Sequence, residues 1–185
     1  MSGDDIIYRF KKALDDLLAN DRKLLDLNVN ERTISHKLAE HMQRHYEGWN
    51  VDCEYNKLGA GGRKWICISQ DVFLRARANG DIPKCIASVA ELQEIADKVS
   101  VFPDIIVHQR GDRHKNLLVV EVKKAGSPRS LQEWDQYKLS HFVKILGYEI
   151  GLLVIVRTGK KLSTEKPPYV LLSYDKGTSE FTDVT

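Results

Sequence analysis

Hydrophobic positions recur with helical spacing in the first quarter of the chain. Over residues 4–27, Ile, Phe and Leu return every three or four positions with Asp and Lys between them, which predicts one amphipathic helix. Residues 28–48 repeat this pattern and predict a second helix, which Asn28 or Asn30 caps and Gly48 ends. The same spacing predicts further helices over 71–80, 88–99 and 130–146.

Short apolar or alternating runs predict strands in the rest of the chain. The expected strands are 49–57, 64–70, 104–109, 117–123, 151–156 and 169–175. The run at 151–156 is continuously apolar, as in a strand that is covered on both faces, and 169–175 is expected at a sheet edge. The order of elements indicates an α/β fold, in which helices flank a central mixed β-sheet.

Charged residues interrupt two of the predicted strands. Asp104 follows Pro103 and opens one strand, whereas Glu121 and Lys123 lie inside the next. Because side chains alternate along a strand, Glu121 and Lys123 share one face, about 7 Å apart. If the two strands pair, Asp104 reaches the same end of the sheet. Two carboxylates that converge there repel each other, and burying them is costly unless a cation compensates them.

A divalent metal ion is the cation that suits these residues. Few, hard oxygen ligands with water completing the shell favour Mg²⁺, for which Mn²⁺ can substitute. Asp104 and Glu121 are the candidate metal ligands, with the backbone carbonyl of Val122 as a third. Lys123 can orient an attacking water, help to deprotonate it, or offset charge on a phosphate.

A further acid comes from the helix before the sheet. With Leu38 at the centre of the buried face, Glu31 lies within about 20° of that direction, whereas Glu40 lies nearly opposite. Glu31 is therefore predicted to point toward the sheet and to join the catalytic acids. An alternative is that Glu31 only accepts a backbone N–H of its own helix, since Asn28 and Glu31 have capping-box spacing.

Composition indicates a single domain over residues 1–185. Three cysteines, an odd number without metal-ligand spacing, indicate reduced thiols and a cytoplasmic protein. No apolar run is long enough to span a bilayer, so no membrane partner is expected. Net charge is only +2, but basic side chains outnumber acidic ones between residues 105 and 170, which favours a polyanionic partner.

Several basic residues are candidates for contacts with nucleic acid. They are Lys57, Arg63, Lys64, Lys124 and Lys138. The first three flank a glycine-rich turn, and Lys124 alternates away from Lys123. Lys138 is also expected to form an i,i+3 ion pair with Asp135 on the helix at 130–146. An ordinary surface role remains the alternative for each.

The acidic motif resembles the signature of a known superfamily. Pro103-Asp104, followed on the next strand by Glu121-Val122-Lys123, resembles the signature of the PD-(D/E)XK nucleases, which have the restriction-endonuclease-like fold. A bacterial and phage group of such proteins is similar over Glu31-Arg32, Asp52-x-Glu54-Tyr55-Asn56, 103–108 and 116–124. The similarity covers residues 28–157. The helix at 1–27 lies outside it, and the segment 64–100 is interpreted as an insertion.

The resemblance implies a metal-dependent nuclease that hydrolyses DNA phosphodiester bonds. Asp104 and Glu121 would hold Mg²⁺, Lys123 would position the water, and Glu31 would complete the acidic cluster. Such an endonuclease acts as a homodimer or within a defence or repair assembly. One alternative is a catalytically silent nuclease fold that binds DNA or regulates a partner. Another is a protein-interaction domain in which Lys123 simply pairs with Glu121 or Asp104.

Overall fold

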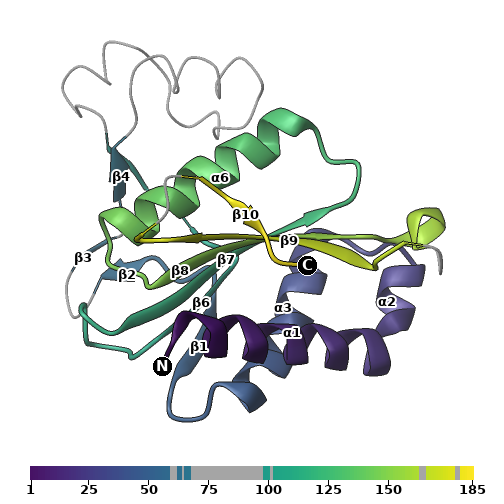
Figure 1. Ribbon diagram of the computed structural model, residues 1–185, viewed down its shortest axis with the longest axis horizontal. Coiled ribbons are helices and arrows are strands. Elements are labelled where there is room, and N and C mark those ends of the chain that lie inside the picture. Colours follow the sequence, from purple (N-terminus) through teal and green to yellow (C-terminus); the bar gives the residue numbers. More distant parts are fainter. Residues whose placement is uncertain (59–61, 64, 68–97, 101, 163–165, 178–179) are drawn as a thin grey trace.

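The computed structural model describes residues 1–185 except 59–61, 64, 68–97, 101, 163–165 and 178–179 (Figure 1). The described helices are α1 (Gly3–Asn20), α2 (Arg22–Asp26), α3 (Glu31–His45), α6 (Arg129–Lys144) and the short 3₁₀ helix η1 (Gly159–Lys161). The helices expected over 71–80 and over most of 88–99 lie outside the described residues.

A mixed sheet forms the centre of the molecule, as the sequence predicts, and it has six strands among the described residues. Its strands, in spatial order, are β1 (Asn50–Cys53), β6 (Ile105–His108), β7 (Asn116–Lys124), β8 (Ile150–Val156), β9 (Tyr169–Asp175) and β10 (Thr182–Asp183). Only β7 and β8 run parallel, and every other neighbouring pair in this sheet is antiparallel. The helix α6 connects the two parallel strands, as such a crossover requires.

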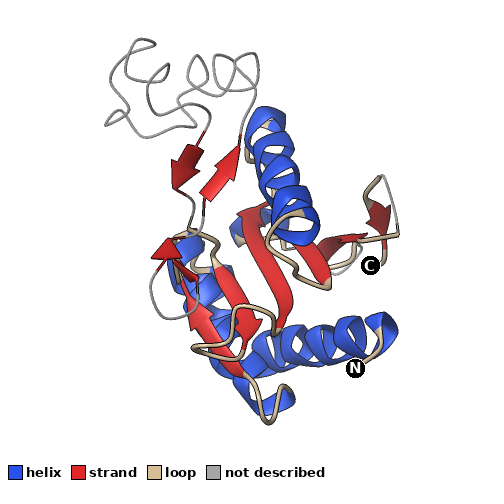
Figure 2. Cartoon of the chain, turned by 90° about the vertical axis from the view of Figure 1, so that its left-hand side faces the viewer, coloured by secondary structure: helices blue, strands red, loops and turns tan. Residues whose placement is uncertain are grey.

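Helices cover both faces of this sheet. Figures 1 and 2 show α6 on one side and α1 with α3 on the other. The alternation along β7 fits these two layers, since Val120 and Val122 pack in the core with α1 and α3, whereas Val119 packs in the core with α6. The apolar run of β8 is buried for the same reason, because helices lie on both of its faces.

The N-terminal helix predicted over 4–27 is divided in the structure. α1 ends at Asn20, and Asp21 lies between it and α2. The break gives Asp21 a contact with α3, because its Oδ2 lies 2.8 Å from Nε2 of the buried His41. The acid that ends α1 is thus paired with a neighbouring helix, which the local pattern does not reveal.

Two further expectations are wrong in detail. Residues 98 and 99 were expected to end a helix, but they belong to β5 (Lys98–Ser100), which pairs with β4 (Trp65–Cys67). β9 is not an edge strand, because β10 pairs with its Leu172 and Ser173. Two exposed residues in β10 are too few to show an alternating pattern.

The glycine-rich turn is flanked by a pair of two-residue strands, β2 (Lys57–Leu58) and β3 (Gly62–Arg63).

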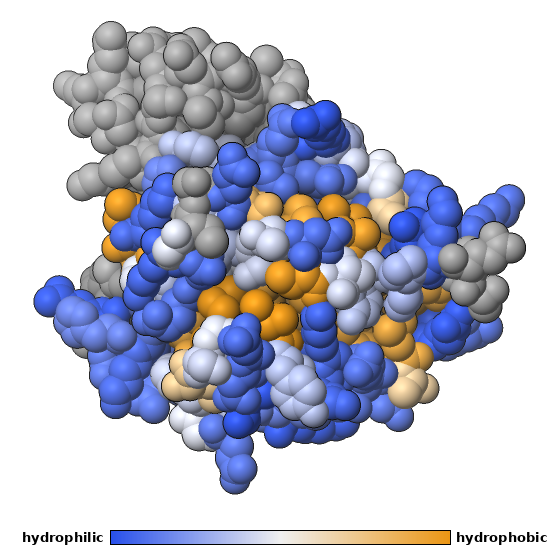
Figure 3. Space-filling view, in the orientation of Figure 1, coloured by the Kyte–Doolittle hydropathy of each residue, from blue (hydrophilic) through white to orange (hydrophobic). Residues whose placement is uncertain are grey.

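The surface is largely polar. Figure 3 shows a band of hydrophobic side chains across the middle of one face, between the regions that α6 and α1 occupy in Figure 1, with hydrophilic residues on either side. Within the part of the chain that the structure describes, no helix combines the length and the apolar character that crossing a membrane requires.

Candidate functional site

The candidate site lies where β7 extends beyond its neighbour β6. Pairing between these strands ends with Ile105 opposite Val120, whereas β7 continues to pair with β8 as far as Lys124. Backbone N–H groups on the β6 side of this extension therefore have no strand partner. Two carboxylates accept them instead: Asp104 Oδ2 lies 2.7 Å from the Val122 nitrogen, and Glu31 Oε1 lies 2.9 Å from the Lys124 nitrogen.

Glu31 reaches this edge from the first turn of α3. Asn30 caps the helix by accepting the Thr33 N–H at 2.8 Å. Glu31 instead accepts the backbone of β7 and, at 3.3 Å, the Ser127 hydroxyl. The capping-box alternative for Glu31 is therefore wrong, and the inward direction predicted for this side chain is confirmed. Glu40 is exposed, as expected for the opposite face, and its carboxylate lies 2.7 Å from Lys37 Nζ.

On the α6 side of β7, buried acids and lysines alternate. Lys138 Nζ lies 2.8 Å from both Glu121 Oε1 and Asp135 Oδ1. Lys123 Nζ lies 2.9 Å from Asp135 Oδ2 and 3.6 Å from Glu31 Oε2. Glu121 is 1% exposed and Asp135 is 2% exposed. Lys123 thus pairs with Asp135 and Glu31 rather than with Glu121 or Asp104, the partners expected for a plain interaction domain.

Acids outnumber bases in this cluster, which we call the β7 cluster. Its carboxylates and ammonium groups are Asp104, Glu121, Asp135, Glu31, Lys123 and Lys138. Fully ionised, these four acids and two lysines carry a net charge of −2. Burial is expensive for such an excess, so the cluster favours the uptake of positive charge.

The pKa values of the two central acids reflect this excess. Burial raises the pKa of Asp104, against the opposing effects of the Val122 hydrogen bond and the nearby lysines. Burial also raises the pKa of Glu121 well above its usual range. The charges of Asp135 and Asp104 add to that rise, whereas Lys138 opposes it. Both acids therefore gain from a proton or a metal cation beside them.

Burial acts on the lysines in the opposite direction. Burial alone would lower the pKa of Lys123, but the neighbouring carboxylates, with Asp135 first and then Glu121 and Asp104, together outweigh burial and raise it. Burial would also lower the pKa of Lys138, but the carboxylates of Glu121 and Asp135, Glu121 first, raise it. Both side chains are therefore ammonium ions at neutral pH. Of the roles predicted for Lys123, orienting a water and offsetting charge are favoured over deprotonating the water.

The donor set fits Mg²⁺ in kind. Within the described ranges, no three or more His, Cys, Asp or Glu side chains are grouped to hold a metal ion. Mg²⁺, however, needs only one or two carboxylates and keeps several waters. Asp104 Oδ1 and Glu121 Oε2 have no hydrogen-bond partner among the described residues. The N–H and C=O of one strand residue lie on the same side of the strand. The Val122 N–H donates to Asp104 on the side that β6 does not cover, so the Val122 carbonyl faces that side too.

The basic residues predicted to contact nucleic acid have different environments. Lys138 lies inside the β7 cluster rather than on an exposed surface. Lys124 Nζ donates to the backbone carbonyls of Asn28 and Val29, at 3.2 and 3.1 Å. Lys57 is exposed on β2, and Arg63 belongs to β3. Lys64 lies outside the described residues.

Glu54, an acid of the similar segment 52–56, lies outside the β7 cluster. Its carboxylate pairs with Arg32 at 2.7 Å, and both side chains are exposed. This ion pair links the residue after β1 to α3.

The cluster includes a role that the sequence reasoning missed. Asp135 and Lys138 form the expected i,i+3 pair, but both are buried against β7 instead of lying on a solvated helix face. The signal was present in the spacing, because Asp135 and Lys138 fall on the side of the helix that also carries the buried Leu139 and Phe142. A charged pair on an apolar face indicates buried partners for both charges.

Comparison of the chain with protein-family models, with curated proteins and with solved structures found no match. The argument for function therefore depends on the geometry of the β7 cluster.

We expect two substitutions of Asp104 to have opposite effects on stability. Asp104→Asn keeps an oxygen that can accept the Val122 N–H and removes one buried negative charge, so the melting temperature should stay unchanged or rise. Asp104→Ala leaves that N–H without its acceptor and should cost about 1–3 kcal/mol. Thermal unfolding followed by circular dichroism measures the melting temperature, and denaturant unfolding measures the free energy of unfolding, for both variants. An equal, large loss in both variants would identify the charge itself as structural.

A second prediction concerns Lys138. Lys138→Met leaves Glu121 and Asp135 without this ammonium group, so the free energy of unfolding at pH 7 should fall by about 3–5 kcal/mol. Glu121→Gln in the same chain should recover part of that loss, because it removes one of the uncompensated charges. Lys37→Met breaks only the exposed pair with Glu40 and serves as the control, with little expected change. A Lys138 variant as stable as this control would contradict the prediction.

Proposed function

We propose that this chain is a metal-dependent DNA nuclease of the restriction-endonuclease-like fold, with Mg²⁺ as its cofactor and Mn²⁺ as a substitute. The observation that supports the proposal is the convergence of Asp104, Glu121, Lys123 and Glu31 at the end of β7. These residues come from three separate segments of the chain, and the cluster that they form with Asp135 and Lys138 carries an excess of negative charge when all its groups are ionised. A cytoplasmic location, and action as a homodimer or within a defence or repair assembly, belong to the same proposal.

The order of elements supports the fold part of the proposal. After α3, the antiparallel strands β1, β6 and β7 lie side by side, and α6 then leads to β8, which is parallel to β7. Asp104 immediately precedes β6 and Glu121 lies on β7, at the end of β7 that extends past the start of β6. Among the described residues, no strand pairs with β7 on the β6 side of this extension.

The proposed hydrolysis gives roles to five residues of the cluster and to the backbone carbonyl of Val122. Asp104, Glu121 and the carbonyl of Val122 would hold Mg²⁺, which when bound supplies a Lewis acid for the phosphoryl oxygen and lowers the pKa of a bound water. Lys123 donates to the attacking water and to the charge that develops on the phosphate. Asp135 and Glu31 are positioning residues, because they hold the Lys123 ammonium between them.

A second candidate function has its own support. Lys138 already occupies one oxygen of Glu121, and Asp104 and Glu31 each accept a backbone N–H of β7. These contacts suit a nuclease fold that has kept its acids for structural reasons, and that binds DNA or regulates a partner without cutting. The two proposals differ in whether Glu121 exchanges Lys138 for a metal ion, and in whether DNA is cleaved.

Metal binding can be measured without any reaction. Mn²⁺ at about 100 times its dissociation constant should stabilise the wild-type protein by about 2.7 kcal/mol. Glu121→Gln should abolish most of this effect, because it removes a charged ligand. Glu149→Gln, which changes an exposed carboxylate paired with Lys176, is the matched control and should respond as the wild type does. Equal stabilisation of all three proteins would count against a metal site at Glu121.

Cleavage tests the role of Lys123. With linear, nicked, branched and single-stranded DNA as substrates, wild-type protein should cleave in Mg²⁺ or Mn²⁺. Lys123→Ala should lower turnover by a factor on the order of 10² or more, while DNA affinity in Ca²⁺ changes little, because the ammonium acts mainly in the transition state. The exposed Lys115→Ala is the control. Absence of cleavage by wild type, with modestly weaker DNA binding by Lys123→Ala, would favour the silent module.

A further inference from the structure

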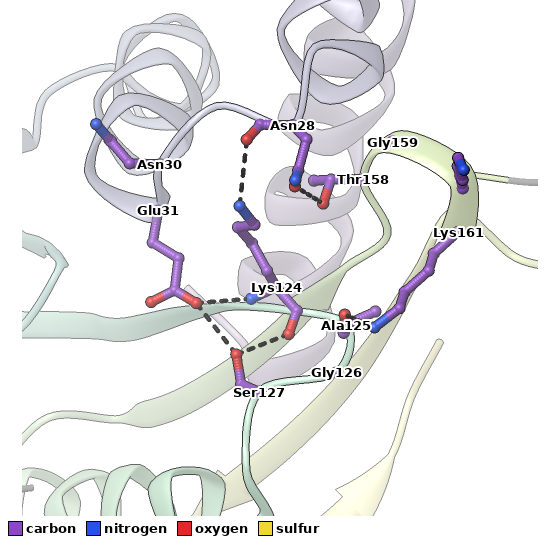
Figure 4. A pocket seen from close by; sticks show the side chains of 11 residues that line it. Asn28, Asn30, Glu31, Lys124, Ala125, Gly126, Ser127, Thr158, Gly159 and Lys161 are labelled. Carbon is purple, nitrogen blue, oxygen red and sulfur yellow. Dashed lines mark hydrogen bonds between the residues drawn. The ribbon is translucent and has the colours of Figure 1, made fainter. Parts of the chain in front are cut away.

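A pocket of about 810 Å³ opens beside the β7 cluster (Figure 4). Its walls are Asn28 and Asn30 before α3, Glu31 at the start of α3, residues 124–127 from the end of β7 onward, and residues 158–161, which include η1. None of the candidate site residues derived from the sequence, apart from Glu31 and Lys124, lies in its lining.

Basic side chains dominate the charge of this pocket. Lys124, Lys160 and Lys161 line it, and Glu31 is its only acid among the described residues. The Glu31 carboxylate is already engaged with the backbone of β7 and with Lys123. No carboxylate of the residues that the structure describes forms an ion pair with any of the three lysines in the lining. The pocket therefore attracts an anion.

Hydrogen bonds to backbone carbonyls hold two of these ammonium groups in place. Lys161 Nζ donates to the Ala125 carbonyl at 2.8 Å, and Lys124 Nζ donates to the carbonyls of Asn28 and Val29. An ammonium group has three N–H donors, so both lysines keep at least one donor for a ligand. Fixing the side chains before binding lowers the entropy cost of recruiting them.

Gly126 makes room for this arrangement. Its φ is +101°, which other residues rarely adopt, and a Cβ at this position would lie 1.9 Å from Lys161 Nζ. Figure 4 shows Lys161 reaching from η1 across to Ala125, beside Gly126. The glycine thus lets a lysine from a distant loop approach the backbone that leaves β7.

Glu31 joins the pocket to the β7 cluster. One of its oxygens accepts the Lys124 N–H in the pocket wall, and the other lies 3.6 Å from Lys123 Nζ. A nucleic-acid strand with one phosphate at Lys123 would therefore meet the pocket with a neighbouring part of its backbone. We infer that Lys160 and Lys161 bind a backbone phosphate of DNA next to the phosphate that the β7 cluster receives. The inference rests on the proposed DNA-directed function.

The test compares two double variants with the same change in net charge. Lys160→Gln/Lys161→Gln removes the charge from the pocket. Lys115→Gln/Lys176→Gln removes the same charge at the opposite end of the sheet, next to the start of β7 and the end of β9. Binding of a fixed-length DNA duplex is measured in Ca²⁺ over a range of salt concentrations, because each neutralised phosphate contributes about 0.9 to the slope of log K against log salt.

We expect the slope for the pocket variant to fall by about one unit, and the slope for the control to match the wild type. Equal slopes for both variants, or no binding of DNA by wild type, would overturn the inference. Cleavage of the same duplex in Mg²⁺ separates this outcome from the fate of the nuclease proposal. Cleavage by wild type with an unchanged slope in the pocket variant would reject the pocket alone. A reduced slope without any cleavage would support the pocket and reject the nuclease.

Discussion

The unequal lengths of β6 and β7 impose the constraint on which the β7 cluster depends. β7 continues beyond Ile105, the first residue of the antiparallel strand β6, so the backbone N–H groups of Val122 and Lys124 need acceptors other than a strand. A buried N–H without an acceptor costs on the order of 1–3 kcal/mol. Asp104 and Glu31 provide the acceptors, one from the residue before β6 and the other from the start of α3. The same two hydrogen bonds that complete the sheet therefore fix two carboxylates at its edge.

Fixing these acids next to Glu121 creates an electrostatic problem that α6 partly solves. Asp135 and Lys138 insert between the acids and lysines of β7, so most charges in the cluster have an opposite charge within ion-pair distance. In a buried network each unpaired member is expensive, and the contributions are coupled. Two negative charges nevertheless remain uncompensated when all groups are ionised. In the proposed nuclease this remainder would favour a bound cation, and Lys124, Lys160 and Lys161 provide positive charge beside it.

The sequence predicts helices and strands whose hydrophobic positions recur with a clear period. It also predicts the side of an element on which a residue lies, because that side follows from the same period. The helix that carries Glu31, a strand beside Asp104, a strand that contains Glu121 and the inward direction of Glu31 all follow from local spacing. The pairing of the two strands does not, because it joins distant segments of the chain. The break at Asp21 could not be predicted, because it depends on His41 in another helix. The partners of Glu121 and Lys123 depend on how α6 lies across β7. The pocket could not be predicted either, since Lys161 meets residues more than 30 positions away.

Glu121 gives the strongest support for a function, because the fold does not account for this residue. Asp104 and Glu31 each accept a backbone N–H of β7, which gives both residues a structural role. Glu121 accepts no backbone N–H from the described residues, and among them only Lys138 binds its carboxylate. Replacing such a buried ion pair with apolar residues of similar volume is often neutral or stabilising. Stability alone therefore gives no reason to keep Glu121 and Lys138 in the core. The proposed metal site would give one, because in that proposal the pair keeps a carboxylate at the end of β7 until a metal ion takes the place of the ammonium group.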